Sequence, residues 1–127
     1  MPAAANKALI YRLYEEAFKQ GNLSIVDELF CPDFVDRSTP DQPPGTAGVK
    51  GYITMVRSGF PDLSIAIEDL VAEEDKVVIR TTWRGTHLGE YEGAAPTNKQ
   101  VSRSMIQIFH LRNGKLCEEW SEGESLL

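Results

Sequence analysis

The segment KLCEEWSEGES, residues 115–125, concentrates carboxylates around a single tryptophan. The segment is typical of a β-strand, in which alternate residues face opposite sides of the sheet. This alternation predicts Leu116 and Trp120 on one face of the strand. Cys117 and Glu119 are then on the other face. If that second face lines a dry pocket, desolvation raises the pKa of the Glu119 carboxyl toward the range that suits proton transfer.

Several other side chains are candidates for lining the same pocket. Trp83 lies in the middle of the β-branched run VVIRTTWRGT and shares a face with Ile79 and Thr81. A buried tyrosine needs a partner for its hydroxyl, and methionine adapts to irregular apolar walls. The remaining candidates lie on apolar faces of expected helices and strands: Tyr14, Tyr52, Met55 and Met105. For all of these residues, packing in the core is the alternative interpretation.

The first half of the chain shows helical periodicity. Apolar residues recur at i, i+3, i+4 and i+7 over residues 10–18, and Gly21 is the expected end of this helix. Residues 23–30 predict a short second helix, which Cys31, Pro32 and Asp33 should break, and residues 33–39 could be a short extended piece. The proline-rich stretch 38–45 predicts a loop, and residues 46–60 predict a third helix.

The second half of the chain changes to a period of two. Alternating or β-branched runs at 63–72, 77–86, 101–111 and 115–125 predict strands, and Asn113-Gly114 is a strong hairpin signal. The expected fold is therefore α+β, with three N-terminal helices packed on a strongly curved, mostly antiparallel sheet of about four to six strands. Such a sheet forms a cone with an internal pocket, and residues 1–127 form a single domain.

Composition excludes several classes of function. The chain of 127 residues has a formal net charge of -6 and no lysine- or arginine-rich run, which argues against binding to nucleic acid. Its two cysteines have no zinc-type spacing, so no metal site is expected. No run is long and apolar enough for a membrane span, and the N-terminus lacks the pattern of a signal peptide. We therefore expect a cytoplasmic protein with two reduced thiols.

The order of these elements resembles the SnoaL-like polyketide cyclase family, within the nuclear-transport-factor-2-like superfamily of α+β cones. Three quoted segments carry the resemblance and cover most of the chain: YRLYEEAFKQGNLSIVDELFCPDFVDRS at 11–38, the stretch from GVKGYITMVRSGFPD to APTNKQV at 48–101, and NGKLCEEWSE at 113–122. The motifs in this order are fairly specific for the family, although the superfamily hosts several chemistries.

The resemblance implies an intramolecular aldol ring closure on a polyketide-like carbonyl substrate, without metal or organic cofactor. A base removes an acidic proton beside a carbonyl, and an acid protonates the carbonyl oxygen under attack. In the family this acid/base is an aspartate just before the tryptophan of the last strand. Glu119 stands at that position here and is the expected catalytic residue.

The resemblance also implies substrate-binding positions. Arg37 stands where the family usually has a histidine in its FVDH motif, and Ile106 lies near the expected place of another family histidine. His87, in the sequence GTH, would lie near the pocket mouth, and residues 89–99 could form a lid. The family usually pairs its sheets, so a homodimer is expected, with Trp120 and Phe109 on the paired face.

Two alternative functions remain open at this point. The chain could be a non-catalytic protein that binds an apolar, carbonyl-bearing small molecule. It could also be an isomerase or an epoxide-hydrolase-type enzyme on the same fold. Either of these enzymes needs a second acid or carboxylate facing the first across the pocket, and the sequence alone reveals no second inward carboxylate.

Overall fold

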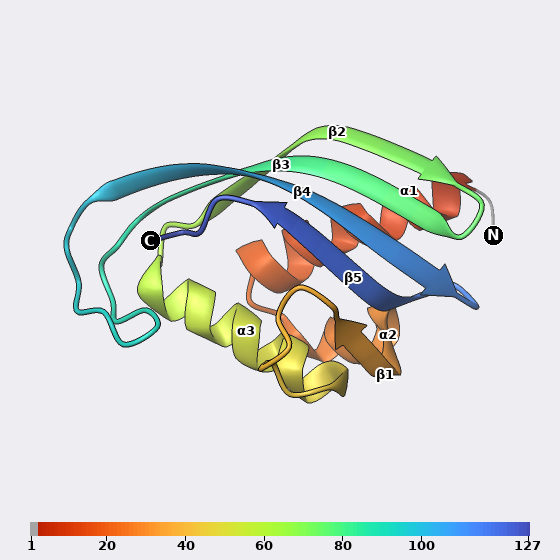
Figure 1. Cartoon of the computed structure of the whole chain (residues 1–127), viewed down its shortest axis with the longest axis horizontal. Coiled ribbons are helices and arrows are strands. Elements are labelled where there is room, and N and C mark those ends of the chain that lie inside the picture. The colour runs from red at the N-terminus through yellow and green to blue at the C-terminus, as the bar shows by residue number, and fades with distance from the viewer. Residues whose placement is uncertain (1–2) are drawn as a thin grey trace.

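The computed structural model describes residues 3–127, and the order of its elements confirms the predicted α+β class. The helical part comprises α1 (Ala3–Arg12), the π-helix η1 (Leu13–Lys19), the 3₁₀ turn η2 (Leu23–Ile25), α2 (Val26–Leu29) and α3 (Gly45–Gly59). The strands are β1 (Phe30–Asp36), β2 (Ser64–Glu73), β3 (Lys76–Thr86), β4 (Gln100–Arg112) and β5 (Lys115–Gly123). Figure 1 shows the long strands arching over the helices.

The first helix buries the apolar stripe that its sequence predicts. Ile10, Leu13, Tyr14 and Phe18 are all nearly inaccessible to solvent. The helix continues through η1 as a π-helix, a wider form that often occurs near functional sites. Gly21 ends it with a φ of 76°, and its N–H donates to the carbonyl of Ala17 at 3.1 Å.

Strand β1 differs from the prediction because it begins at Phe30, before the expected break at Cys31–Asp33. The strand lies at the edge of the sheet and pairs only with β5. A proline is tolerated on such an edge, because one side of the strand needs no hydrogen bonds to a neighbour. Pro32 therefore does not interrupt the strand.

The five strands form one mixed, open sheet in the order β1-β5-β4-β3-β2. β2 to β5 are antiparallel neighbours, whereas β1 runs parallel to β5. Asn113 and Gly114 both have positive φ, at 53° and 75°, as the predicted tight hairpin requires. The inner face of the sheet packs against the helices and forms the core.

A bulge in β5 changes the predicted alternation. Leu111 pairs with Leu116 and His110 pairs with Glu118, so Cys117 is an extra residue on β5. Leu116 therefore faces the core and is fully buried, so the prediction that Leu116 lies on the outer face is wrong. Beyond the bulge, the predicted alternation holds for Glu119 and Trp120.

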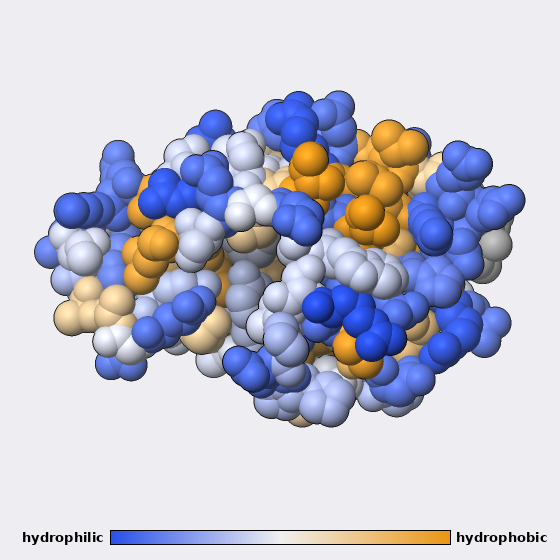
Figure 2. All heavy atoms as spheres, viewed as in Figure 1, coloured by the Kyte–Doolittle hydropathy of each residue, from blue (hydrophilic) through white to orange (hydrophobic). Residues whose placement is uncertain are grey.

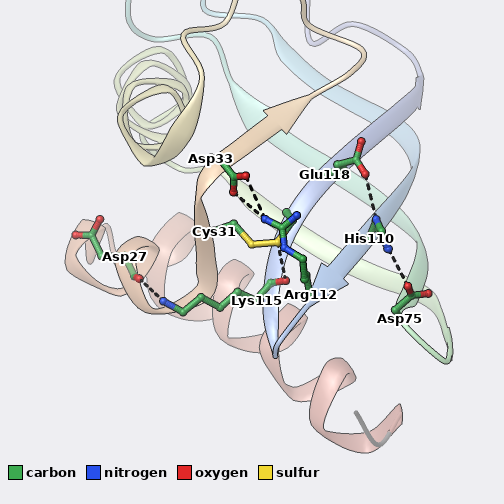
Figure 3. Close-up of a disulfide and its surroundings, with 9 residues drawn as sticks. Asp27, Cys31, Asp33, Asp75, His110, Arg112, Lys115 and Glu118 are labelled. Atoms are coloured by element: carbon green, nitrogen blue, oxygen red, sulfur yellow. Dashed lines mark hydrogen bonds and ion pairs between the residues drawn. A yellow bond between two sulfur atoms is a disulfide. The ribbon is translucent and has the colours of Figure 1, made fainter.

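The two cysteines form a disulfide, contrary to the prediction of two reduced thiols. Cys31 of β1 and Cys117 of β5 are bonded, with their Cα atoms 4.9 Å apart, and 86 positions separate them in the sequence. Figure 3 shows the bond between the two parallel strands, close to the ion pair of Arg112 with Asp33. The structure thus removes one argument for a cytoplasmic location.

Among residues 3–127, none of the helices combines the length and the apolar character that crossing a bilayer demands.

Reduction of the Cys31–Cys117 bond should destabilise the protein markedly. A cross-link over such a long loop restricts the unfolded chain and contributes roughly 2 to 5 kcal/mol. We expect the free energy of unfolding in urea to fall by this amount when dithiothreitol is added. The double variant Cys31→Ser/Cys117→Ser is the control, and its unfolding should not respond to the reductant. Equal unfolding of the wild type in oxidising and reducing buffer would contradict the prediction.

Candidate functional site

A cavity of about 140 Å³ lies between the helices and the inner face of the sheet, and Glu119 is one of the residues that line it. The first helix, β1 and the loop after it, α3 and three strands all contribute to its wall. The lining residues are Leu13, Tyr14, Phe18, Phe34, Asp36, Thr39, Gln42, Val49, Tyr52, Trp83, Met105, Gln107, Phe109, Glu119 and Ser121. We call this space the Glu119 cavity.

Two hydrogen bonds hold the Glu119 carboxyl, and both go to the same oxygen. Gln107 Nε2 donates to Oε2 at 2.6 Å, and the Ser121 hydroxyl donates to Oε2 at 3.1 Å. Within the described part of the chain, no hydrogen bond involves Oε1 of Glu119. The carboxyl is therefore fixed in orientation, and its other oxygen is left for a proton or a ligand.

Gln107 connects the carboxyl to a buried phenol. The Tyr14 hydroxyl donates to Gln107 Oε1 at 2.7 Å, while the amide of the same side chain donates to Glu119. Both hydrogen bonds require the glutamine amide in one orientation. Tyr14, Gln107 and Glu119 thus form a chain of hydrogen bonds from η1 through β4 to β5.

The environment of Glu119 favours its protonated form. Burial, together with the negative charge of Asp36, raises the pKa of the Glu119 carboxyl to about 7, although the bonds from Gln107 and Ser121 oppose this rise. Asp36 is close because it is the register partner of Glu119 in the parallel pairing of β1 with β5. A carboxyl with this pKa is well matched to giving and taking protons near neutral pH.

The phenols of the cavity are neutral donors. Burial, with a smaller effect of the Glu119 charge, raises the pKa of Tyr14 well above its ordinary value. Burial likewise raises the pKa of Tyr52. Both hydroxyls therefore keep their protons at neutral pH. The Tyr14 hydroxyl donates its proton to Gln107, whereas that of Tyr52 is suited to hydrogen bonding with a carbonyl oxygen.

Aromatic rings form much of the apolar wall. Trp83 is almost completely buried, and its Nε1 donates to Thr81 at 2.9 Å. Its ring meets those of Tyr14 and Phe18 edge to face, with centroids 6.2 and 5.4 Å apart. The indole is thus locked in place as one side of the cavity.

The structure brings together part of the predicted set of site residues. Glu119, Tyr14, Tyr52, Trp83 and Met105 all line the cavity. The placement of these side chains agrees with the prediction, whereas their roles in binding or catalysis stay predictions.

The other four predicted residues lie outside the lining of this cavity. Met55 is partly buried against the core, and Ile106 is 48% exposed on the outer face of the sheet. Arg37 points outward, where it pairs with Glu118 at 2.8 Å. His87 is completely buried and stacks on Phe60, so it is not at the mouth of the cavity.

The predicted set of site residues did not include Gln107, Asp36 or Ser121, which line the cavity. The residue at the inner position of β4 is Gln107, one place beyond the predicted Ile106. Both faces of β4 carry large apolar residues, which hides the alternation. Counting in steps of two from Phe109 identifies Gln107 as an inward polar residue only when Phe109 is known to be buried, whereas the sequence-based prediction placed Phe109 on the paired outer face. Asp36 supplies the second inward carboxylate that the sequence did not reveal.

The predicted lid is held in place by its tyrosine. Tyr91 is buried, and its ring meets that of Phe60 with centroids 5.2 Å apart. The segment 89–99 contributes no residue to the lining of the Glu119 cavity. Thr39 and Gln42, from the proline-rich loop, border the cavity instead.

A second cavity of about 270 Å³ lies between the first helix and the edge strand β2. Tyr11, Tyr14, Glu15, Phe18, Lys19, Leu63, Ser64, Ile65 and Ile67 line it. Its charged groups, Glu15 and Lys19, are largely exposed and form a loose pair at 3.8 Å. It is larger than the Glu119 cavity but lacks a buried acid or base, so the smaller cavity is the candidate active site.

Comparison with known proteins agrees with the fold. The family model described as SnoaL-like polyketide cyclase matches residues 8–126. No curated protein is similar enough in sequence to count as a match. Among solved structures, TsrD from Streptomyces laurentii is 27% identical, with a TM-score of 0.90 over 98% of this chain and 91% of that one.

Two further solved structures are similar over nearly the whole chain. AclR from Streptomyces galilaeus, described as a candidate hydroxylase, is 30% identical with a TM-score of 0.82, covering 97% of this chain and 91% of that one. IdmH from Streptomyces antibioticus, described as a candidate polyketide cyclase, is 30% identical with a TM-score of 0.78, covering 94% and 91%. Since the family model spans nearly all of the sequence, the chain belongs to the SnoaL-like polyketide cyclase family.

Proposed function

We propose that the protein is a cofactor-free cyclase that closes a ring by intramolecular aldol chemistry on an apolar, carbonyl-bearing substrate. The observation that carries this proposal is the Glu119 carboxyl, which lines the cavity between the helices and the sheet with one oxygen fixed by Gln107 and Ser121 and the other free. Membership in a family named for polyketide cyclases supports the same reaction.

The proposed reaction needs one group that first takes and then returns a proton. Ionised Glu119 removes a proton from the carbon between two carbonyl groups of the substrate. The resulting enolate carbon attacks the carbon of another carbonyl group, farther along the same molecule, and a carbon–carbon bond forms. Glu119, now protonated, gives its proton to the oxygen of the attacked carbonyl, so the enzyme returns to its starting state.

The cavity wall supplies the remaining requirements. A flexible chain of carbonyl groups must fold so that its reacting carbons meet, and the rigid wall formed by Trp83, Phe34 and Phe109 restricts its shape. The hydroxyl of Tyr52 lies in the same lining and is suited to hold a carbonyl oxygen. Burial, with a smaller effect of the Asp36 charge, raises the pKa of Glu119, so that the protonated acid is available at neutral pH.

We also propose that two copies of the chain pair through the outer face of the sheet. Four exposed apolar side chains form one row across four strands, because Val71 pairs with Val78, Val78 with Ile108, and Ile108 with Trp120. Figure 2 shows apolar side chains gathered over the strands on the face turned to the viewer. Phe109, which the sequence analysis placed on this face, is buried on the inner face instead.

A second copy of the chain fits this row better than a partner protein whose surface carries charges of a single sign. The row is bordered by charges of both signs, with the Asp69–Arg80 pair on one side and the His110–Glu118 pair on the other. In a two-fold arrangement the apolar row packs on itself, and the borders offer opposite charges to each other.

Glu119→Gln should abolish ring closure while leaving the fold intact. The amide is nearly isosteric but neither takes nor returns a proton, so turnover should fall roughly 10²- to 10⁴-fold. A suitable substrate is ethyl 3,7-dioxooctanoate, whose carbon 2 is acidic and whose aldol closure and dehydration give a conjugated cyclohexenone with a strong ultraviolet absorbance.

Glu118→Gln is the matched control for this experiment, because Glu118 lies next in sequence but faces outward, where it pairs with Arg37 and His110. Its turnover should equal that of the wild type. Equal turnover by Glu119→Gln would remove the proposed mechanism. Binding of the ester by the wild type without ring closure would instead favour a non-catalytic binding protein.

The proposed ionisation of Glu119 can also be measured without a substrate. Its carboxyl has a pKa of about 7 in the folded protein, against an ordinary value of 4.5, so the folded state holds the proton more tightly than the unfolded state. Glu119 therefore favours folding at low pH, and this contribution is lost as the pH rises from about 4.5 to about 7.

The free energy of unfolding of Glu119→Gln, compared with that of the wild type, should reveal this loss. The free energy of unfolding of the variant minus that of the wild type should rise by at most about 3 kcal/mol between pH 4.5 and 7 and be constant outside that window. Because the carboxyl faces the cavity, we expect a rise smaller than this limit. The measurement is urea unfolding at a series of pH values. A pH-independent difference would show that the folded and unfolded states bind the Glu119 proton with equal affinity.

Ile108→Glu should dissociate the proposed dimer. Ile108 lies in the middle of the apolar row. In the dimer, the second copy would bury a carboxylate at this position without an oppositely charged partner. We expect a dimer mass for the wild type and a monomer mass for the variant by sedimentation equilibrium. Ser102→Glu, on the same face of β4 but away from the row, should stay dimeric. A monomeric wild type at high micromolar concentration would exclude this interface.

A further inference from the structure

Asp36 brings a second carboxyl group to the Glu119 cavity. It lines the cavity together with Glu119 and is the register partner of that residue in the parallel pairing of β1 with β5. Register partners lie on adjacent strands about 4.8 Å apart, with their side chains on the same face of the sheet. The two carboxyl groups therefore lie side by side in the wall, and the longer side chain of Glu119 extends farther from the backbone.

The backbone that follows Asp36 holds this arrangement in place. The N–H of Arg37 donates to the carbonyl of Glu119 at 2.8 Å, and the N–H of Ser121 donates to the Ser38 hydroxyl at 2.8 Å. The N–H of Ser38 in turn donates to Oδ1 of Asp36 at 3.0 Å. These bonds continue the contact between the two strands beyond the end of β1, so the position of Asp36 beside Glu119 is fixed.

Each of the two carboxyl groups has one oxygen available to a substrate. Within residues 3–127, the N–H of Ser38 is the one hydrogen-bond donor to the Asp36 side chain, and it contacts Oδ1. Oδ2 of Asp36 is therefore unpaired, as is Oε1 of Glu119, whose other oxygen accepts the bonds from Gln107 and Ser121. Both carboxyl groups are thus oriented by the protein and still have one oxygen each for proton transfer.

The two carboxyl groups differ in the proton that they carry at neutral pH. Burial, and then the negative charge of Asp36, raise the pKa of Glu119 to about 7, so a large share of Glu119 is protonated while Asp36 is the ionised neighbour. The other titratable groups of the lining are Tyr14 of η1 and Tyr52 of α3, and burial keeps both neutral. The cavity therefore presents a carboxylic acid beside a carboxylate, an arrangement typical of acid/base pairs.

Loss of water from a β-hydroxy carbonyl compound requires an acid and a base in this relation. The proposed ring closure creates such a compound, an aldol adduct whose new hydroxyl group lies on the carbon next to the acidic carbon. The hydrogen to be removed and the hydroxyl to be expelled are on neighbouring atoms. Two carboxyl groups on neighbouring strands can therefore contact both at once from one side of the ring.

We propose that Asp36 is the catalytic base of a second reaction in the Glu119 cavity, the dehydration of the aldol adduct, in which Glu119 is the acid. This inference rests on the proposed ring closure and specifies its released product as a conjugated enone. Asp36 thereby has a chemical role of its own, in addition to its effect on the charge of Glu119.

The protons and electrons of this step balance. Glu119 gives its proton to the new hydroxyl oxygen during ring closure, and it takes up another proton from water before dehydration. Asp36 then removes the remaining proton of the acidic carbon, and the electron pair of that C–H bond forms the carbon–carbon double bond. The C–O bond breaks, and the oxygen takes the proton of Glu119 and leaves as water. Asp36 finally releases its proton to the solvent.

The adduct itself can be supplied as a substrate, so that dehydration is measured without ring closure. The β-hydroxy ester formed by closure of ethyl 3,7-dioxooctanoate is suitable, since carbon-13 NMR distinguishes its carbinol carbon from the alkene carbon of the enone. The wild type should dehydrate this adduct faster than buffer alone. Asp36→Asn should lower the enzymatic rate roughly 10²- to 10⁴-fold, because the amide accepts no proton.

Asp33→Asn is the matched control, because Asp33 belongs to the same strand but is exposed and pairs with Arg112 at 3.0 Å. This variant should dehydrate the adduct at the wild-type rate. Asp36→Ser also removes the carboxyl group and should show the same loss if Asp36→Asn does not fold. With the open-chain diketo ester as substrate, the product of the Asp36 variants should change from the enone to the adduct.

The pH dependence of the wild type tests the assignment of the two roles. Ring closure begins with ionised Glu119 and should become faster as the pH rises to about 7. Dehydration requires protonated Glu119, so its rate should fall roughly ten-fold for each pH unit above about 7, after subtraction of the rate in buffer. Dehydration by Glu119 alone would begin with its ionised form, and its rate would rise with pH instead.

The outcomes distinguish this inference from the function on which it rests. If the wild type closes the ring but dehydrates the adduct no faster than buffer, or if Asp36→Asn dehydrates it as fast as the wild type, the role of Asp36 is wrong and the proposed ring closure stands. If the wild type dehydrates the adduct but does not close the ring, the ring-closure proposal fails and the dehydration stands. If neither reaction occurs, both proposals fail.

Discussion

The extra residue in β5 is the constraint on which the rest of the site depends. Because Cys117 is inserted opposite β4, Leu116 enters the core, and three residues later Glu119 also faces inward. Without the bulge, a strand that buries Leu116 would turn Glu119 outward and Trp120 inward. The same residue carries the disulfide to β1, so the bulge and the cross-link together fix the strand that brings Asp36 beside Glu119.

Much of the fold could be predicted because its signals are local. The apolar stripe of the first helix, Gly21 at its end and the Asn113-Gly114 hairpin depend on neighbouring residues and appear in the structure as predicted. The parallel pairing of β1 with β5 and the bulge at Cys117 could not be predicted, because they depend on contacts between segments far apart in the sequence. The start of β1 was missed because Pro32 is a strand breaker except on an edge.

The candidate site could be predicted only in part, because local signals identify some of its residues and contacts between distant segments place the others. Glu119 follows from strand alternation near the hairpin and from the family resemblance, and the structure places it in the cavity. Gln107 was missed because β4 is apolar on both faces, so its alternation carries little information. His87 was misplaced because the order of residues in a strand does not reveal how the following loop folds back, and here the ring packs on Phe60.

The composition of the cavity wall has a consequence for the order of the chemical events. In the described part of the chain, its lining includes two carboxyl groups but no lysine, arginine or histidine. An enolate formed there gains no stabilisation from a positive charge, and the Asp36 carboxylate repels it. A free enolate should therefore be short-lived, so that proton removal and carbon–carbon bond formation occur almost together. The cavity thereby favours substrates whose second carbonyl is already folded against the acidic carbon when the proton leaves.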